Sequence, residues 1–149
     1  MATVRLQISA TPAHVRTARL VATAVARRSG VADSALDEIR LAVGEACSRA
    51  VSLHEEFAPH ELITLLLADQ GTFVVTVRDM GPTGAEARHI DPLEGFDGLG
   101  VPETFFAGNG GRMPAGFGLA LIGGLVDDVE IDPAGDGPGT VVRMSWPLG

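Results

Sequence analysis

Lysine is absent from this sequence of 149 residues, and cysteine occurs once. A P-loop nucleotide site, a Schiff-base enzyme and a eukaryotic-type protein kinase each need a lysine at the reactive or phosphate-binding position, so the sequence excludes all three classes. A single cysteine excludes a disulfide framework and a cysteine-based zinc site. The four histidines have no common spacing, which argues against a metal centre.

The sequence also lacks an apolar run approaching the ~20 residues of a membrane span, and its N-terminus has no signal-peptide pattern. A net charge of −8 argues against a general nucleic-acid binder. We therefore expect a cytoplasmic protein that contacts neither membrane nor nucleic acid directly. Residues 1–54 carry a net charge of +3 and residues 55–149 a net charge of −11. Two faces with different partners would explain this split, and so would an ordinary solvated surface.

With 46% hydrophobic residues, residues 1–149 are expected to form one domain with its own core. Apolar residues recur at helical spacing in two segments and in a short third one, 15–28, 34–54 and 118–126. Alternating or continuous apolar runs predict five strands, at 4–8, 61–68, 72–78, 129–131 and 140–146. This order of elements predicts an α/β sandwich with helices on one face of a mixed sheet.

The second predicted helix has two distinct faces. Cys47 falls on the apolar face, where we interpret it as a small buried hydrophobic residue. His54, at the predicted end of the helix, is expected to interact with the helix dipole. The residues on the polar face are Glu38, Glu45, Ser48, Arg49 and Ser52.

Residues 81–118 contain ten of the nineteen glycines and four prolines. A connection of this length within one domain is normally either functional or disordered. Asp79 and Gly81 stand at its start, at the end of an apolar strand, where a carboxylate can accept a hydrogen bond from an adenine amine. Gly116 and Gly118 stand at its end and open a helix, an arrangement that offers N–H groups to phosphate. Together these features predict a nucleotide pocket under a mobile lid.

Three segments carry a specific resemblance. The segments 45–51, 77–81 and 116–119, with the sequences EACSRAV, VRDMG and GFGL, resemble in order and spacing the N, G1 and G2 boxes of the GHKL (Bergerat-fold) ATPases. Among these, the chain looks most like the bacterial anti-sigma factors that double as serine protein kinases in partner-switching modules. The resemblance implies a two-layer α/β sandwich with helices on one face of a mixed, mostly antiparallel sheet, and an ATP lid at about 82–115.

The resemblance also implies a ligand, ATP or ADP, and residues that would bind it. Asp79 would recognise the adenine amine, with Gly81 and Thr140 beside it. Glu45 would be the general base that takes the proton from a substrate serine. The residues that would meet the phosphates are Arg112, Gly116 and Gly118.

Protein partners are implied in the same way. The chain would bind a sigma factor through Arg16 and Arg19 of the first helix, and an anti-anti-sigma protein with a STAS domain would antagonise it. A homodimer is expected by resemblance.

Two positions depart from the family pattern. Arg49 stands where an asparagine would coordinate Mg²⁺, and arginine has no acceptor with which to ligate a cation. Arg49 would instead pair with Glu45, four residues earlier, or reach the phosphates. Thr83 stands where a second glycine is expected. Two hypotheses therefore remain: an active serine kinase that acts on the STAS-domain partner, and a catalytically inactive binding module that switches partners without Mg²⁺-dependent transfer.

Overall fold

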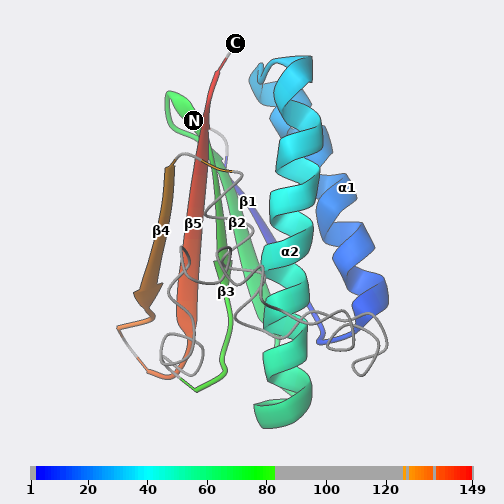
Figure 1. Ribbon diagram of the computed structural model, residues 1–149, viewed down its shortest axis with the longest axis vertical. Coiled ribbons are helices and arrows are strands. Elements are labelled where there is room, and N and C mark those ends of the chain that lie inside the picture. Colours follow the sequence, from blue (N-terminus) through cyan, green and yellow to red (C-terminus); the bar gives the residue numbers. More distant parts are fainter. Residues whose placement is uncertain (1–2, 83–125, 127, 136, 149) are drawn as a thin grey trace, which may run out of the picture.

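The computed structural model describes residues 3–82, 126, 128–135 and 137–148. In these ranges two helices pack against one face of a sheet (Figure 1), which confirms the predicted fold class. The helices are α1 (Pro12–Ser29) and α2 (Asp33–Phe57). The strands are β1 (Thr3–Ile8), β2 (Ile63–Asp69), β3 (Thr72–Arg78), β4 (Asp128–Pro133) and β5 (Thr140–Pro147). The short helix expected at 118–126 and nearly all of the expected lid lie outside the described residues.

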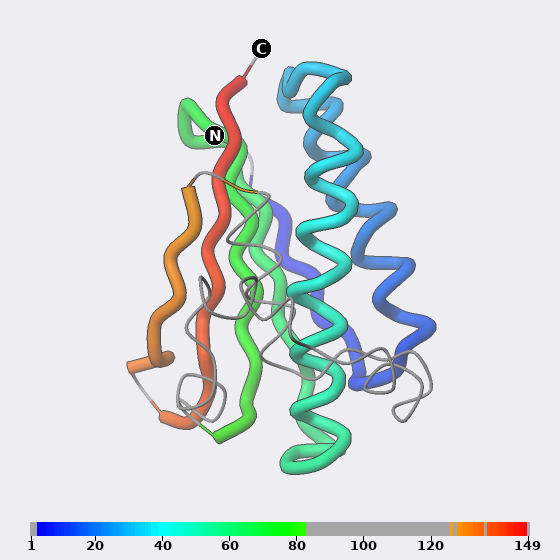
Figure 2. The backbone as a smooth tube through the Cα atoms, in the orientation of Figure 1, coloured from blue at the N-terminus to red at the C-terminus, as the bar shows by residue number. Residues whose placement is uncertain are grey.

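The strands are arranged in the order β1-β2-β3-β5-β4. All four of these pairings are antiparallel, so the described sheet is antiparallel throughout rather than mixed. A tight turn joins β2 to β3, and Gly71 supplies the positive φ of 81° that this turn requires. The end of β3 and the start of β5 therefore lie at the same end of the sheet, beside the C-terminal half of α2 (Figure 2).

Strand alternation explains why one face of the sheet is apolar. Every second residue of the central strands points towards the helices and is fully buried, while the residues between them face the other side. The helix-facing residues of β2 and β3 are Ile63, Leu65, Leu67, Phe73, Val75 and Val77. Across this face, Trp146 of β5 donates through Nε1 to a carboxylate oxygen of Glu38 on α2, at 3.0 Å.

Small residues allow the two helices to pack closely. Ala18, Ala22 and Ala26 of α1 and Ala46 of α2 have no exposed surface. Pro12 begins α1, where its missing N–H costs nothing, and Gly30 ends it in the left-handed conformation with φ 94°. No helix in the described ranges is long and apolar enough to cross a membrane.

Candidate functional site

The site lies where α2, the end of β3 and the start of β5 meet. Asp79 directly follows β3, and its backbone N–H donates to the carbonyl oxygen of Thr140 at 3.1 Å. Its carboxylate turns towards the residues that follow it, so that Oδ1 accepts the backbone N–H of Gly81 at 2.9 Å. Asp79, Gly81 and Thr140, which the resemblance places beside one another, are adjacent here, and all three are buried.

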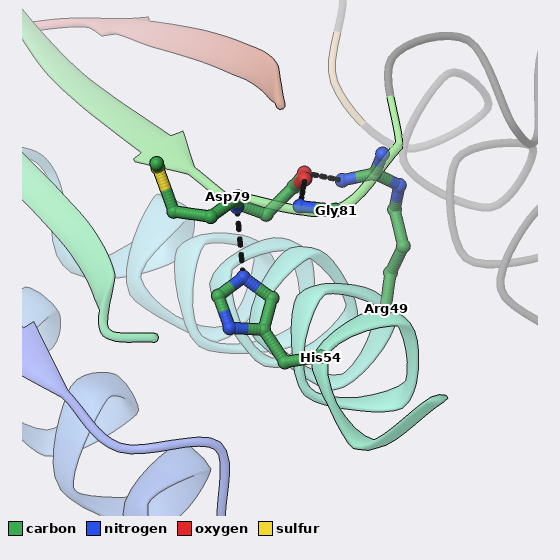
Figure 3. A network of polar contacts seen from close by, with 5 residues as sticks. Arg49, His54, Asp79 and Gly81 are labelled. Carbon is green, nitrogen blue, oxygen red and sulfur yellow. Dashed lines mark hydrogen bonds and ion pairs between the residues drawn. The ribbon is translucent and has the colours of Figure 1, made fainter. Parts of the chain in front are cut away.

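A buried ion pair crosses this site from the helix layer. Nη1 of Arg49 on α2 donates to Oδ2 of Asp79 at 2.8 Å (Figure 3), and the two side chains are 1% and 0% exposed. Desolvation by burial lowers the pKa of Arg49, and the negative charge and hydrogen bond of Asp79 oppose that shift. A guanidinium stays charged when it is buried, so it needs a counter-ion, and Asp79 supplies one.

This ion pair corrects the sequence analysis on two points. Arg49 is expected on the polar face of the second helix, but only 3% of its surface is exposed. The sequence offers Glu45 or the phosphates as its partner, and the structure adds a third group, Asp79, 30 positions along the chain. Nothing in the local sequence signals this contact, because it depends on how α2 packs against the end of β3.

His54 fixes the backbone that follows Asp79. Its Nδ1 lies 3.0 Å from the carbonyl oxygen of Glu61, and its Nε2 lies 2.8 Å from the backbone nitrogen of Met80. A carbonyl can only accept and a backbone N–H can only donate, so the ring is the neutral tautomer with its proton on Nδ1. The charge–dipole role expected for His54 is therefore replaced by two specific hydrogen bonds, and α2 continues past it to Phe57.

Glycine at position 139 allows β5 to approach the same segment. Gly139 has φ 120°, and a Cβ atom added there would overlap the carbonyl oxygen of Asp79. A larger residue would therefore be strained in its backbone and would collide with the site. Asp79 is thus held from three directions, by β5, by the turn to Gly81 and by α2.

Glu45, the expected general base, lies one helical turn before Arg49 and is half-buried. Burial raises the pKa of its carboxyl above the usual 4.5, and the charge of Arg19 on α1 opposes that rise. Arg19 lies across α2, because a Cβ placed on Gly44 would come within 2.9 Å of its Cδ atom. A carboxyl with a raised pKa is a better proton acceptor than an exposed one, provided that it is ionised.

The remaining predictions have mixed outcomes. Cys47 is completely buried, as predicted, and burial raises the pKa of its thiol to about 12. Arg16 is exposed on α1, whereas Arg19 lies at the boundary with α2. Arg112, Gly116, Gly118 and Thr83 lie outside the described residues. Within the described ranges, no group of three or more His, Cys, Asp or Glu side chains is placed to hold a metal ion.

Comparison with known proteins agrees with this arrangement. The family model of the histidine kinase-like ATPase domain matches residues 8–146, a range that includes α2, the end of β3 and most of β5. No curated protein matches the chain. The domain family suggests a nucleotide as ligand. The match extends over nearly the whole sequence, and the chain belongs to the histidine kinase-like ATPase domain family.

Proposed function

We propose that this protein is an anti-sigma factor of the partner-switching type. In this proposal it binds a sigma factor through α1, and an anti-anti-sigma protein with a STAS domain displaces that partner. The proposal is supported by the family, by the resemblance of the N, G1 and G2 segments, and above all by the charge of α1. This helix contains four arginines and no acidic residue, in a chain whose net charge is −8.

The exposed face of α1 has the character of a protein-binding surface. Arg16 and Leu20 are one turn apart and both exposed, and Leu20 exposes 61% of its surface. Arg27 and Arg28 extend the positive charge to the end of the helix. An apolar side chain flanked by guanidinium groups complements an acidic amphipathic segment, because the charges orient the partner and the apolar contact is buried on binding.

We further propose that partner switching proceeds without Mg²⁺-dependent phosphoryl transfer. Kinases neutralise the transferred phosphates with metal ions, and Arg49 stands at the position where the family has its metal-binding asparagine. The competing function, a serine kinase acting on the STAS-domain protein, is favoured by the raised pKa of Glu45, which suits a general base. Both functions share the same protein partners, so they must be separated by assaying transfer directly.

The partner surface can be tested by charge reversal. Arg16→Glu should weaken capture of sigma factors from the source organism at least about tenfold, corresponding to ~1.4 kcal/mol, with a smaller effect at high salt. Arg40→Glu is the matched control, because Arg40 is an exposed arginine on α2, away from this face. Equal capture by both variants and the native protein would remove α1 from the partner surface.

Catalysis can be tested with γ-labelled ATP and the STAS-domain partner in the presence of Mg²⁺. We expect no transfer of label to a serine of that partner. Transfer that is lost in Glu45→Ala would establish the kinase and would contradict a purely non-catalytic switch. As a control, the same preparation should still bind the STAS-domain protein. Binding shows that the sample is folded, so that a lack of transfer cannot be due to inactive protein.

A further inference from the structure

The carboxylate that would recognise adenine is already engaged within the chain. The resemblance assigns the exocyclic amine of the nucleotide to Asp79, and such a contact needs an acceptor that faces an accessible space. In the described structure Oδ1 accepts the N–H of Gly81 and Oδ2 accepts Nη1 of Arg49, while Asp79 has no exposed surface. The residues present therefore do not fit an adenine base in the way that the family implies.

Arg49 presents to Asp79 the same chemistry that adenine would. The guanidinium and the exocyclic amine of adenine are both planar N–H donors attached to an sp² carbon, and both suit a carboxylate oxygen. The guanidinium also carries a positive charge, which makes its hydrogen bond to a carboxylate stronger than that of a neutral amine. In a site where both side chains are buried, a neutral base competes poorly with this internal cation.

Asp79 also has little freedom to serve two partners. Its backbone is bonded to Thr140, the next peptide N–H is held by His54, and Gly139 packs against its carbonyl oxygen. A nucleotide would therefore have to displace Arg49 rather than find the carboxylate in another position. Displacement would break a buried, charge-assisted hydrogen bond between Arg49 and Asp79.

We propose that Arg49 is an internal ligand that occupies the place of the adenine amine at Asp79, so that the domain keeps its base-recognition site closed. The native protein then binds adenine nucleotides very weakly. Arg49 blocks the place where adenine would bind, not the place where a metal ion would bind. This inference is independent of the proposed partners, because it concerns only α2, the end of β3 and β5.

Calorimetric titration with adenosine and with ADP tests the proposal. The native protein should show no saturable binding up to about 1 mM ligand. Arg49→Asn should bind both ligands at least about tenfold more tightly, corresponding to ~1.4 kcal/mol. The gain should be equal in Mg²⁺ and in EDTA, and adenosine should show it although it has no phosphate. Arg40→Asn, which removes an exposed arginine from the same helix, should behave as the native protein does.

Three results would overturn the proposal: micromolar binding of ADP by the native protein, no binding by a folded Arg49→Asn variant, or a gain that appears only with Mg²⁺. The last would place Arg49 at the metal position instead. Should Arg49→Asn fail to fold, NMR of the native protein decides the question. The guanidinium N–H signals of Arg49 should be unchanged by millimolar ADP, and a shift that saturates with ADP would refute an internally closed site.

Discussion

The buried pair of Arg49 and Asp79 makes a quantitative prediction about stability. Arg49→Met removes the cation but keeps a long apolar side chain, which leaves the carboxylate of Asp79 without its charged partner. Asp79→Asn does the converse: its amide oxygen can still accept the N–H of Gly81, but its amide nitrogen would face the guanidinium donor to donor. Each single substitution therefore removes one charge of the buried pair and leaves the other in place.

The expected size of the effect follows from burial. The two side chains are 1% and 0% exposed, so solvent cannot replace the lost partner. Removing one member of such a pair costs about 3–5 kcal/mol of the free energy of unfolding. The double variant Arg49→Met/Asp79→Asn removes both charges together and should lose less stability than the two single effects summed, because neither buried charge is left without its counter-ion.

Urea denaturation of the native protein, the two single variants and the double variant measures this coupling. Arg40→Met is the matched control, because Arg40 pairs with Asp37 at 2.9 Å, close to the 2.8 Å of the buried pair, but with exposures of 50% and 90%. We expect a cost of at most about 1 kcal/mol for that substitution. The reasoning is refuted if Arg49→Met costs no more than Arg40→Met, or if the two single effects simply add in the double variant.

Three further predictions concern neighbouring residues. Gly139→Ala should destabilise the fold by at least about 2 kcal/mol in urea, because the new Cβ would meet the carbonyl oxygen of Asp79 at a strained φ. Glu45→Gln should raise stability at neutral pH by less than about 1 kcal/mol, and the gain should vanish in acid. The pKa of the native Glu45 carboxyl is raised, so the folded state favours its protonated form. The carboxyl therefore stabilises the fold at low pH, and this stabilisation is lost as the pH rises through the pKa of the folded state. Cys47 should not react with a thiol reagent at about pH 8 until urea unfolds the chain, because its thiol is buried and its pKa is about 12.

Each of these predictions has a control. Gly135, like Gly139, has a positive φ, here 81°, but no atom lies within 4 Å of a Cβ added to it. Gly135→Ala should therefore lower the free energy of unfolding by less than Gly139→Ala does. Glu56→Gln on the exposed side of α2 should show no comparable gain at neutral pH. Native Cys47 reacting as fast as a free thiol would show that the core opens readily at this helix.

The fold was largely predictable from local patterns. The strand at 72–78 has the same bounds in the structure as its apolar pattern predicts, and the other predicted elements that lie in the described ranges differ only at their ends. α2 runs further than expected, to Phe57, and the N–H of Ala58 still bonds to the carbonyl oxygen of His54. Apolar periodicity locates an element well, but the end of a helix depends on which groups cap it in the folded chain.

The site was predictable only in part. Asp79, Gly81 and Thr140 belong to motifs that follow or begin strands, and the pairing of β3 with β5 brings them together as expected. The burial of Arg49 and the two hydrogen bonds of His54 could not be inferred, because an arginine between Ser48 and Ala50 gives the same helical pattern whether it faces solvent or a distant carboxylate. Charged residues are rarely buried unless they are paired, so the polar face was the natural interpretation.

By itself, the sequence determined which chemistry the protein cannot use, where its helices and strands lie and which family motifs it carries, because composition and periodicity act along the chain. The tertiary structure alone decided that Arg49 faces Asp79. That contact joins α2 to the end of β3 across 30 positions, and its strength comes from exclusion of water, a property of the packed layers rather than of any segment. Of the two residues that depart from the family pattern, Arg49 is thus one whose contact only the folded chain reveals.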